Sequence, residues 1–509
     1  MGGLITTVGV VVIINVLSRA LALVSGVLVT SVFGVTAQTS AYSFALTLTN
    51  AITTVIGTTL TTAVIPIYTR LKQNSLERAN YFINNTLTLT VICAVVLAII
   101  GALTSPLTAS LAKDGDYNFA IYAICTMMPA IIFICLYFVF SGLLQANDRF
   151  FAVAMVSIPS SLINMAYIIF ASKYFGVKGL VVSTMIGFFV QAFVLVFPMR
   201  KLDFRFKLSF DYANEDIKGI INVLGPIIIG VCSYQINIIT NSAIALAHDS
   251  ERYIILNNVQ NLGIQIVMTI ILAVAAVMYP KFSLLAAQDK TDEHGKQYLT
   301  TINATMLVLA PVTLIFIVCA KSIVNIVYGY GKFTPDDVAF GGGIFALYAI
   351  SFIGLGLKEL TDKAFYSLKN TKTSAYNGIV VMTVNILLSA AFVRIWGFYG
   401  IALAYSVAAL TGAANIMYQY RKKYKLLLKP VFVTLIKMFI SSAVMAVVCV
   451  LTNKLQLGSG KIWSVIQVGV VSVAGTIVYA IMLCLLKTTE VVNLIDNIKI
   501  KFKQGVKNR

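Results

Sequence analysis

Charged side chains are scarce in this chain. Only 11% of its 509 residues are Asp, Glu, Lys or Arg, whereas 59% are hydrophobic and the mean hydropathy is +0.89. A soluble globular domain carries about 25% charged residues. Apolar runs of roughly 20 residues, long enough to cross a ~30 Å hydrocarbon core as helices, recur from end to end without a long soluble segment. The composition therefore predicts an all-α polytopic membrane protein.

Residues that hold metals, disulfides or nucleotides are also few. The two histidines and seven cysteines show no paired-ligand spacing, and no GxxxxGK[ST] motif is present. The loops are too short for a nucleotide-sugar domain, which argues against a membrane-embedded glycan transferase. We therefore predict no cofactor, no metal centre and no enzymatic activity. Without a soluble domain to present a basic surface, we also predict no nucleic-acid partner.

Hydropathy windows of about 19 residues predict about fourteen spans. They cover 4–33, 41–69, 81–110, 118–144, 151–173, 178–199, 216–247, 253–284, 297–327, 340–368, 375–395, 398–420, 431–453 and 462–487. Twelve of them form two pseudo-symmetric halves of six, and two are left over. The predicted organisation is an N-lobe over 1–200, a cytoplasmic linker over 201–215, a C-lobe over 216–425, two C-terminal helices over 426–487 and a basic cytoplasmic tail over 488–509.

Basic residues are distributed unevenly between alternate loops. If the N-terminus lies inside, the inner loops and the tail hold about 26 Lys and Arg, and the outer loops hold about 8. This bias predicts that both termini are cytoplasmic. The formal net charge of +19 therefore reports the orientation of the chain in a membrane.

Polar side chains gather on predicted spans 1, 2, 7 and 8. Residues three or four apart share one face of a helix, and the candidates are Asn15, Arg19 and Ser25 in span 1, Asn50 and Thr54 in span 2, Asn237 and Asn241 in span 7, and Asn257, Asn261 and Gln265 in span 8. Such residues can join helices by hydrogen bonds worth ~0.6–2 kcal/mol each. Four stripes at corresponding places in the two halves favour a water-filled cavity instead, as in transporters built from repeats.

Arg19 is the only basic residue well inside any of the first eight predicted spans. An ionised side chain there costs ~3 to more than 10 kcal/mol and is a functional-site candidate by default. Its guanidinium suits a phosphate, which it can bind with two parallel hydrogen bonds. A structural ion pair or snorkelling is the alternative for Arg19, and snorkelling is our interpretation of Lys358 near the end of span 10.

Acidic residues are absent from the middle of every predicted span, since Glu359 and Asp362 stand at the inner end of span 10. An antiporter of organic cations would be expected to have a buried carboxylate. The sequence therefore favours an anionic or sugar-rich cargo.

Several runs resemble the MurJ (MviN) family of lipid II flippases, within the multidrug/oligosaccharidyl-lipid/polysaccharide exporter superfamily. In order along nearly the whole chain they are SRALALVSGVLVTSVFG (18–34), IPIYTRL (65–71), LLQANDRFFAVAMVSIPSSLINM (143–165), MYPKFSLLA (278–286), VYGYGKFTPDD (327–337) and GLGLKELTDKAFYSLKNTKTS (354–374). The resemblance implies fourteen helices, two six-helix lobes with a V-shaped cavity, and a groove on the last two helices for a polyprenyl tail. It also implies that undecaprenyl-pyrophosphate-linked peptidoglycan precursor crosses the bacterial cytoplasmic membrane, driven by membrane potential.

This chain resembles a divergent member of that family, because several of the family's charges are replaced. Arg19 matches the first cavity arginine. The positions where the family has an arginine or an aspartate and this chain has an uncharged residue are Ser25, Ser40, Thr53 or Thr54, and Asn261. A sodium site proposed for some members would correspond to Asn385 and, in place of an aspartate, Ser389.

The leading hypothesis is an alternating-access flippase that moves lipid II from the inner to the outer leaflet for cell-wall synthesis. Arg19 would bind the pyrophosphate, and the polar stripes would solvate the headgroup. The expected partners are lipid II and membrane lipids, and we expect a monomer. The alternatives are a flippase for another lipid-linked oligosaccharide, such as a teichoic or capsular precursor, a small-molecule antiporter, and a non-transporting scaffold.

Overall fold

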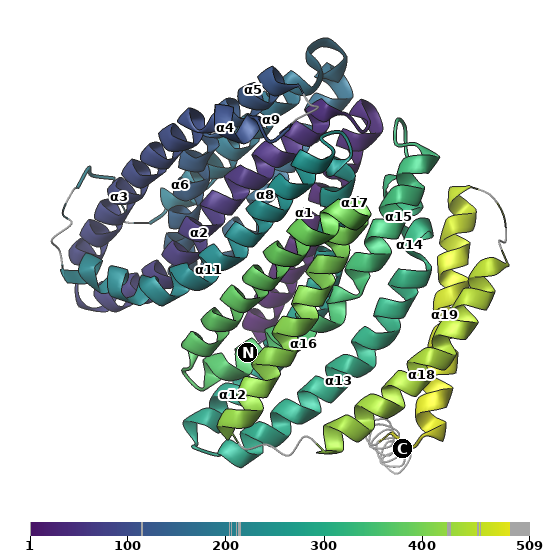
Figure 1. The fold of residues 1–509 in the computed structure, drawn as a ribbon. Helices are drawn as coiled ribbons and strands as arrows, with labels where there is room; N and C mark the ends of the chain where they lie inside the picture. The colour runs from purple at the N-terminus through teal and green to yellow at the C-terminus, as the bar shows by residue number, and fades with distance from the viewer. Residues whose placement is uncertain are drawn as a thin grey trace. The chain divides into compact units, whose positions relative to one another are not determined.

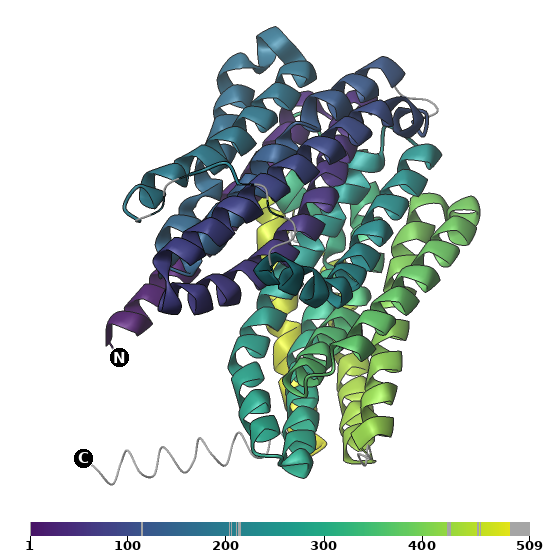
Figure 2. The same ribbon diagram turned by 90° about the vertical axis from the view of Figure 1, so that its left-hand side faces the viewer.

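The structure is a computed structural model that describes residues 2–112, 116–202, 204, 206–209, 211, 215–424, 429–455, 458 and 460–488. The described residues are helical and contain no strand (Figures 1 and 2). The chain divides into two compact units, residues 1–258 with 330–333, and residues 259–329 with 334–509. The predicted basic tail falls outside the described residues, apart from Thr488.

The first unit is built from helices that run from the N-terminus to the beginning of α12. They are α1 (Gly2–Phe33), α2 (Ala37–Asn74), α3 (Leu76–Leu103), α4 (Ser105–Ala109), α5 (Tyr117–Met127), α6 (Ala130–Gln145), α7 (Phe150–Met155), α8 (Ser157–Ala166), the π-helix η1 (Tyr167–Ala171), α9 (Ser172–Val194), α10 (Val196–Met199), α11 (Glu215–His248) and the start of α12 (Tyr253–Ala287). Helix α2 packs against α3, α5, α6 and α11, so it is central to this unit.

The turn between α1 and α2 shows how local sequence fixes this arrangement. Gly34 has a φ of 81°, a left-handed value that glycine adopts without strain. Thr36 then caps α2: its hydroxyl accepts from the Thr39 backbone N–H, and the Thr39 hydroxyl accepts from the Thr36 N–H. This reciprocal pair satisfies two backbone donors that a helix start leaves unpaired.

Residues 330–333 dock on the end of α1. The Lys332 backbone N–H donates to the Ser31 carbonyl at 2.8 Å, and Gly331 lies so close that a Cβ there would fall 2.1 Å from the same oxygen. The φ of Gly331 is also positive, at 59°. Gly331, the second glycine in the run VYGYGKF, is therefore required by both backbone conformation and contact.

The second unit contains the rest of α12 and the helices that follow it. They are α13 (Thr291–Val318), α14 (Ala320–Tyr328), α15 (Pro335–Ala349), α16 (Ser351–Ser367), α17 (Thr371–Tyr424), α18 (Lys429–Lys454) and α19 (Lys461–Leu485). The start of α15 explains the run TPDD, because Thr334 and Asp337 form a capping box and Pro335 takes the first helical turn. Gly354 allows α16 to approach the backbone of α17 at Ala409.

Ten segments of the described residues are long and apolar enough to cross a membrane. Two of them, Phe150–Met199 and Thr371–Tyr424, are broken inside by Gly176 and Gly397, which have non-helical backbone angles. Helices α2 and α11 are also long enough to cross a membrane. Counting each broken segment twice and adding α2 and α11 gives the fourteen spans that the sequence predicts.

The two breaks share one sequence pattern: a basic residue, any residue, an aromatic residue, Gly, two residues and Gly. It reads KYFGVKG at 173–179 and RIWGFYG at 394–400. Gly176 (φ 56°, ψ −148°) and Gly397 (φ 56°, ψ −134°) have nearly the same conformation. This recurrence supports an internal repeat. The two compact units divide near residue 258, so the lobe boundary at 201–215 stays a prediction.

Separate apolar clusters hold each unit together. In the first unit, the buried side chains of α2, α3 and α6 gather around Phe82, Ile83 and Leu143. In the second unit, Phe282, Tyr298 and other side chains join α12, α13, α16 and α17. Helices α18 and α19, the yellow-green and yellow pair in Figure 1, lie side by side and pack on α13 around a further buried cluster.

All seven cysteines are free of disulfides. Cys135, Cys319 and Cys449 are buried, but Cys93 and Cys484 are exposed on the helix surface.

Candidate functional site

Helix α1 carries the predicted charge of the site. The side chains of Asn15 and Arg19 are exposed, whereas Ser18 is buried and its hydroxyl donates to the Ala154 carbonyl at 3.4 Å. The helix thus packs on α7 through Ser18 and leaves Arg19 accessible. Ser25, further along α1, is half-buried.

Exposure alone does not mark a polar face on this part of α1. The apolar Ile13, Val16 and Leu17 are also at least half exposed. What distinguishes Arg19 is therefore its charge on an apolar helix, and not its accessibility.

The threonines of α2 satisfy their own hydroxyl donors. Thr47, Thr53, Thr54 and Thr58 each donate to the carbonyl four residues earlier, at 2.6–2.8 Å. A hydroxyl bonded in this way is tolerated in apolar surroundings, and its oxygen still accepts hydrogen bonds. These residues are suited to accept from sugar hydroxyls and peptide N–H groups. They are poorly suited to bind a phosphate, which is itself an acceptor.

The predicted residues of α2 differ in accessibility. Asn50 is exposed and Thr54 is half-buried, so both can meet a ligand. Thr53 is buried. Of the two threonines that the resemblance placed at a cavity arginine, Thr54 is therefore the accessible one.

Ser40 and Asn257 join α2 to the start of α12 within the first unit. The fully buried Ser40 hydroxyl donates to the Glu251 carbonyl at 2.7 Å and accepts from the Ile254 backbone N–H at 3.1 Å. The Asn257 amide donates to Thr47 Oγ1 at 3.2 Å and to the Tyr253 hydroxyl at 3.1 Å. Asn257 is thus engaged in a helix–helix contact, as is Ser40, so a ligand role for either residue stays a prediction.

Helix α11 presents a buried polar strip in the first unit, where it packs on α2. Asn237 and Asn241 are both buried, and the Asn241 side-chain oxygen has no hydrogen-bond partner. A buried amide oxygen without a partner costs ~1–3 kcal/mol. Asn241 is therefore a residue whose oxygen would gain from an incoming donor.

The remaining predicted residues belong to the second unit. Asn261 and Gln265 are exposed on α12. Asn385 and Ser389 are fully buried on α17, and the Ser389 hydroxyl donates to the Asn385 side-chain oxygen at 3.2 Å. No group of three or more His, Cys, Asp or Glu that could hold a metal ion occurs in the part of the chain that the structure describes.

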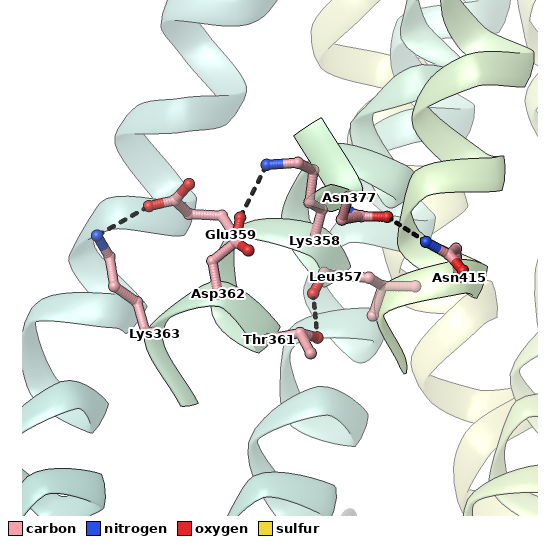
Figure 3. Close-up of polar contacts among 8 residues, drawn as sticks. All are labelled: Leu357, Lys358, Glu359, Thr361, Asp362, Lys363, Asn377 and Asn415. Carbon is pink, nitrogen blue, oxygen red and sulfur yellow. Dashed lines mark hydrogen bonds and ion pairs between the residues drawn. The ribbon is translucent and has the colours of Figure 1, made fainter. Parts of the chain in front are cut away.

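A charged cluster on α16, shown in Figure 3, is the main feature that sequence reasoning interpreted differently. Lys358 Nζ lies 2.8 Å from Asp362 Oδ2, and Lys363 Nζ lies 3.1 Å from Glu359 Oε1. The snorkelling interpretation of Lys358 is therefore replaced by an ion pair one helical turn long. The i, i+4 spacing of these residues was the signal for it.

Polar groups of α17 surround this ion pair. Asn415 donates to the Asn377 side-chain oxygen at 2.8 Å, while Asp362 Oδ1, the Ser374 hydroxyl and the Asn377 amide nitrogen have no hydrogen-bond partner. The buried carboxylate of Asp362 is thus neutralised by Lys358. Because its charge is compensated within the helix, this carboxylate differs from the one expected of a cation antiporter.

The long apolar helices and the repeated breaks place the chain in the class of polytopic helical membrane proteins. A family model described as "Lipid II flippase MurJ" matches residues 29–471. The chain belongs to the MurJ family, and its many apolar helices make it a multi-pass protein of the bacterial cytoplasmic membrane.

Curated relatives are distant but numerous. The chain is 23% identical to a probable lipid II flippase MurJ of Bdellovibrio bacteriovorus over 57% of this chain and 56% of that one. It is 23% identical to the corresponding protein of Buchnera aphidicola subsp. Schizaphis graminum over 81% of this chain and 82% of that one.

Solved structures agree on the fold. An inward closed conformation of lipid II flippase MurJ matches with a TM-score of 0.77 and 22% identity, over 93% of this chain and 97% of that one. An inward-facing multidrug MATE transporter of the MOP superfamily matches with a TM-score of 0.66 and 15% identity, over 82% of this chain and 98% of that one. The all-α transporter fold predicted from the sequence is confirmed.

Proposed function

We propose that this protein is a flippase that moves lipid II, an undecaprenyl-pyrophosphate-linked peptidoglycan precursor, across the cytoplasmic membrane. The observation that carries the proposal is the match of the MurJ family model along residues 29–471. The protein acts by alternating access as a transporter and catalyses no covalent step. Relatives described as probable lipid II flippases MurJ support this assignment.

Arg19 binds the pyrophosphate in this proposal. Its guanidinium is accessible on α1 and supplies a fixed fork of donors for phosphate oxygens. Asn15, Asn50 and Thr54 are accessible in the same unit and solvate sugar and peptide groups. Asn261 and Gln265 have the same role in the second unit. Ser25, Thr53, Asn237 and Asn241 complete the proposed set of polar residues.

The orientation follows from the distribution of basic residues, which supports cytoplasmic termini. We also propose that the protein works as a monomer. Helices α18 and α19 hold the polyprenyl tail, and their exposed Phe439, Leu451 and Ile477 supply an apolar surface for it.

The test is rescue of a bacterial strain depleted of its own lipid II flippase. Arg19→Ala should abolish rescue while its membrane level stays normal, and Arg19→Lys should be impaired because a point charge replaces the fork. Lys173→Ala, at an exposed cation of the Gly176 break, is the matched control and should rescue fully. Full rescue by Arg19→Ala would remove Arg19 from the mechanism.

The other candidate cargo is a different lipid-linked oligosaccharide. Among the positions matched to the family's cavity arginines, this chain keeps an arginine at position 19 and has uncharged residues at the others. Native mass spectrometry with lipid II and one teichoic-type precursor separates the two. Retention of the competitor alone would replace lipid II as the cargo. The likeness to a MATE transporter makes small-molecule antiport the second class, and a vesicle efflux assay tests it.

A further inference from the structure

A pocket of about 680 Å³ lies beside the Gly176 break, within the first unit. Its walls come from Tyr122 of α5, Ile163 of α8, Tyr167 of η1 and residues 174–186 of α9. The volume falls in the range of about 300–1,000 Å³ that is typical of ligand sites. None of the predicted substrate-binding residues lines it.

Two tyrosines explain why the pocket stays open. The left-handed Gly176 interrupts the helix, and the Tyr167 hydroxyl donates to the Gly176 carbonyl at 2.6 Å. The Tyr122 hydroxyl donates to the Lys178 carbonyl at 3.3 Å. Hydrogen bonds to two backbone carbonyls of the break therefore hold both rings in place as walls of the pocket.

Gly179 lies against Tyr167 in the lining of the same pocket. A Cβ at this position would lie 2.2 Å from the Tyr167 hydroxyl oxygen. The second glycine of the repeated pattern therefore makes room for the tyrosine that stabilises the first.

The chemistry of the pocket is apolar with one cation. Val182 and Ile186 line it, while the exposed Lys178 places its ammonium group 6.0 Å from the centre of the Tyr122 ring. Neighbouring aromatic side chains are strongly exposed, including Phe170 at 77% and Tyr174 at 81%. Exposed aromatic and basic residues at a connection between spans mark the depth where lipid headgroups meet acyl chains.

The corresponding place in the second unit carries a packed aromatic ring. Tyr399 occupies the position of Lys178 in the repeated pattern, and its ring packs edge-on against Phe340 with centroids 5.6 Å apart. Its ring also lies over Gly343. The side chain at this position therefore differs between the two breaks, a cation at the first and a packed ring at the second.

We propose that this pocket binds an anionic glycerophospholipid, with an acyl chain against Val182 and Ile186 and the phosphate on Lys178. A membrane lipid reaches the site laterally, because the pocket opens among side chains that are exposed on membrane helices. The positive charge of Lys178 complements a lipid phosphate and its net negative headgroup. With cytoplasmic termini, the bound lipid belongs to the outer leaflet.

Native mass spectrometry of the purified full-length protein tests the proposal, with phosphatidylglycerol and phosphatidylcholine of identical acyl chains as probes. Wild type should retain phosphatidylglycerol preferentially. Lys178→Ala should lower this preference about fivefold, the effect of one cation at an anionic lipid surface. Val182→Trp, which fills the pocket, should reduce retention of both lipids.

Lys173→Ala is the matched control, because Lys173 is an exposed cation of the same break that does not line the pocket. It should retain the wild-type preference. Equal retention by wild type and Lys178→Ala would overturn the proposal even if Val182→Trp does not fold. Lysine-dependent retention of lipid II in place of phosphatidylglycerol would overturn it as well. These results are independent of rescue by Arg19 variants, so failure of the lipid site leaves the proposed transport untouched.

Discussion

Residues 173–179 and 394–400 form the same helix break in the two units, yet their surroundings differ. The first break has a lysine at its sixth position, two tyrosines bonded to backbone carbonyls and a pocket of about 680 Å³. The second has Tyr399 at that position, packed against Phe340. Where two repeats share a backbone conformation, a side chain that differs between them is not needed for that conformation. Lys178 is such a side chain, so it is a candidate for a functional role.

The two units also differ in the surroundings of a basic side chain within a membrane helix. Arg19 of the first unit is accessible on an apolar helix, whereas Lys358 of the second unit is bonded to the buried Asp362. Of the two cations, Arg19 is the more exposed, which makes it the better candidate for an anionic ligand.

The largest expected effect is that of breaking the pair on α16. Lys358→Ala leaves the Asp362 carboxylate, 5% exposed, without its cation. Removing one partner of a fully buried pair costs ~3–5 kcal/mol. Because the Lys358 side chain is 26% exposed, we expect a loss of about 2–3 kcal/mol in the free energy of unfolding. Thermal unfolding of the purified protein in detergent measures it.

Lys363→Ala is the control for that substitution. Its partner Glu359 is 22% exposed, so water replaces the lost cation and the loss should stay below about 1 kcal/mol. Equal destabilisation by the two variants would contradict the distinction between a buried and an accessible pair.

The second glycine of each break provides the next test. A Cβ at Gly400 would lie 2.3 Å from the Phe392 backbone oxygen, whereas a Cβ at Gly179 would meet the end of the Tyr167 side chain. Backbone cannot move aside as a side chain can. We expect Gly400→Ala to cost about 2 kcal/mol and Gly179→Ala about 1 kcal/mol of unfolding free energy.

Gly176→Ala and Gly397→Ala measure the cost of backbone strain at the first glycine of each break. With a φ of 56° and ψ of −148° and −134°, both glycines lie in a region essentially restricted to glycine, so both substitutions should cost about 1–3 kcal/mol from backbone strain alone. A large difference between these two variants would show that the breaks are not equivalent.

The fold class was predictable because hydropathy over some 20 residues depends on composition and not on contacts. The number of spans followed from the same signal. The exact bends did not, since the breaks at Gly176 and Gly397 lie within otherwise continuous apolar segments. Comparing the runs KYFGVKG and RIWGFYG would have located them, because they share one pattern 221 residues apart (397 minus 176).

The polar residues were harder to interpret from sequence. The resemblance placed Ser40, and the polar pattern placed Asn257, among candidates for a cavity. Whether such a side chain faces water or a helix end depends on contacts distant in the chain. Ser40 bonds to residues 251 and 254, more than 200 positions away. The burial of Asp362 likewise depends on how α16 packs on α13 and α17, which the i, i+4 spacing does not reveal.

Exchanging the side chains that differ between the breaks should have the smallest effect on stability. Lys178→Tyr should fill part of the pocket and remove its cation, so retention of phosphatidylglycerol over phosphatidylcholine should fall about fivefold while the unfolding temperature changes little. Tyr399→Lys removes a ring that packs against Phe340 and should lower the unfolding free energy by about 1 kcal/mol. If Tyr399→Lys also creates a preference for phosphatidylglycerol, a lysine at this position is sufficient for lipid selection. If only Lys178→Tyr changes lipid retention, the selection also needs the two tyrosines that hold the first pocket open.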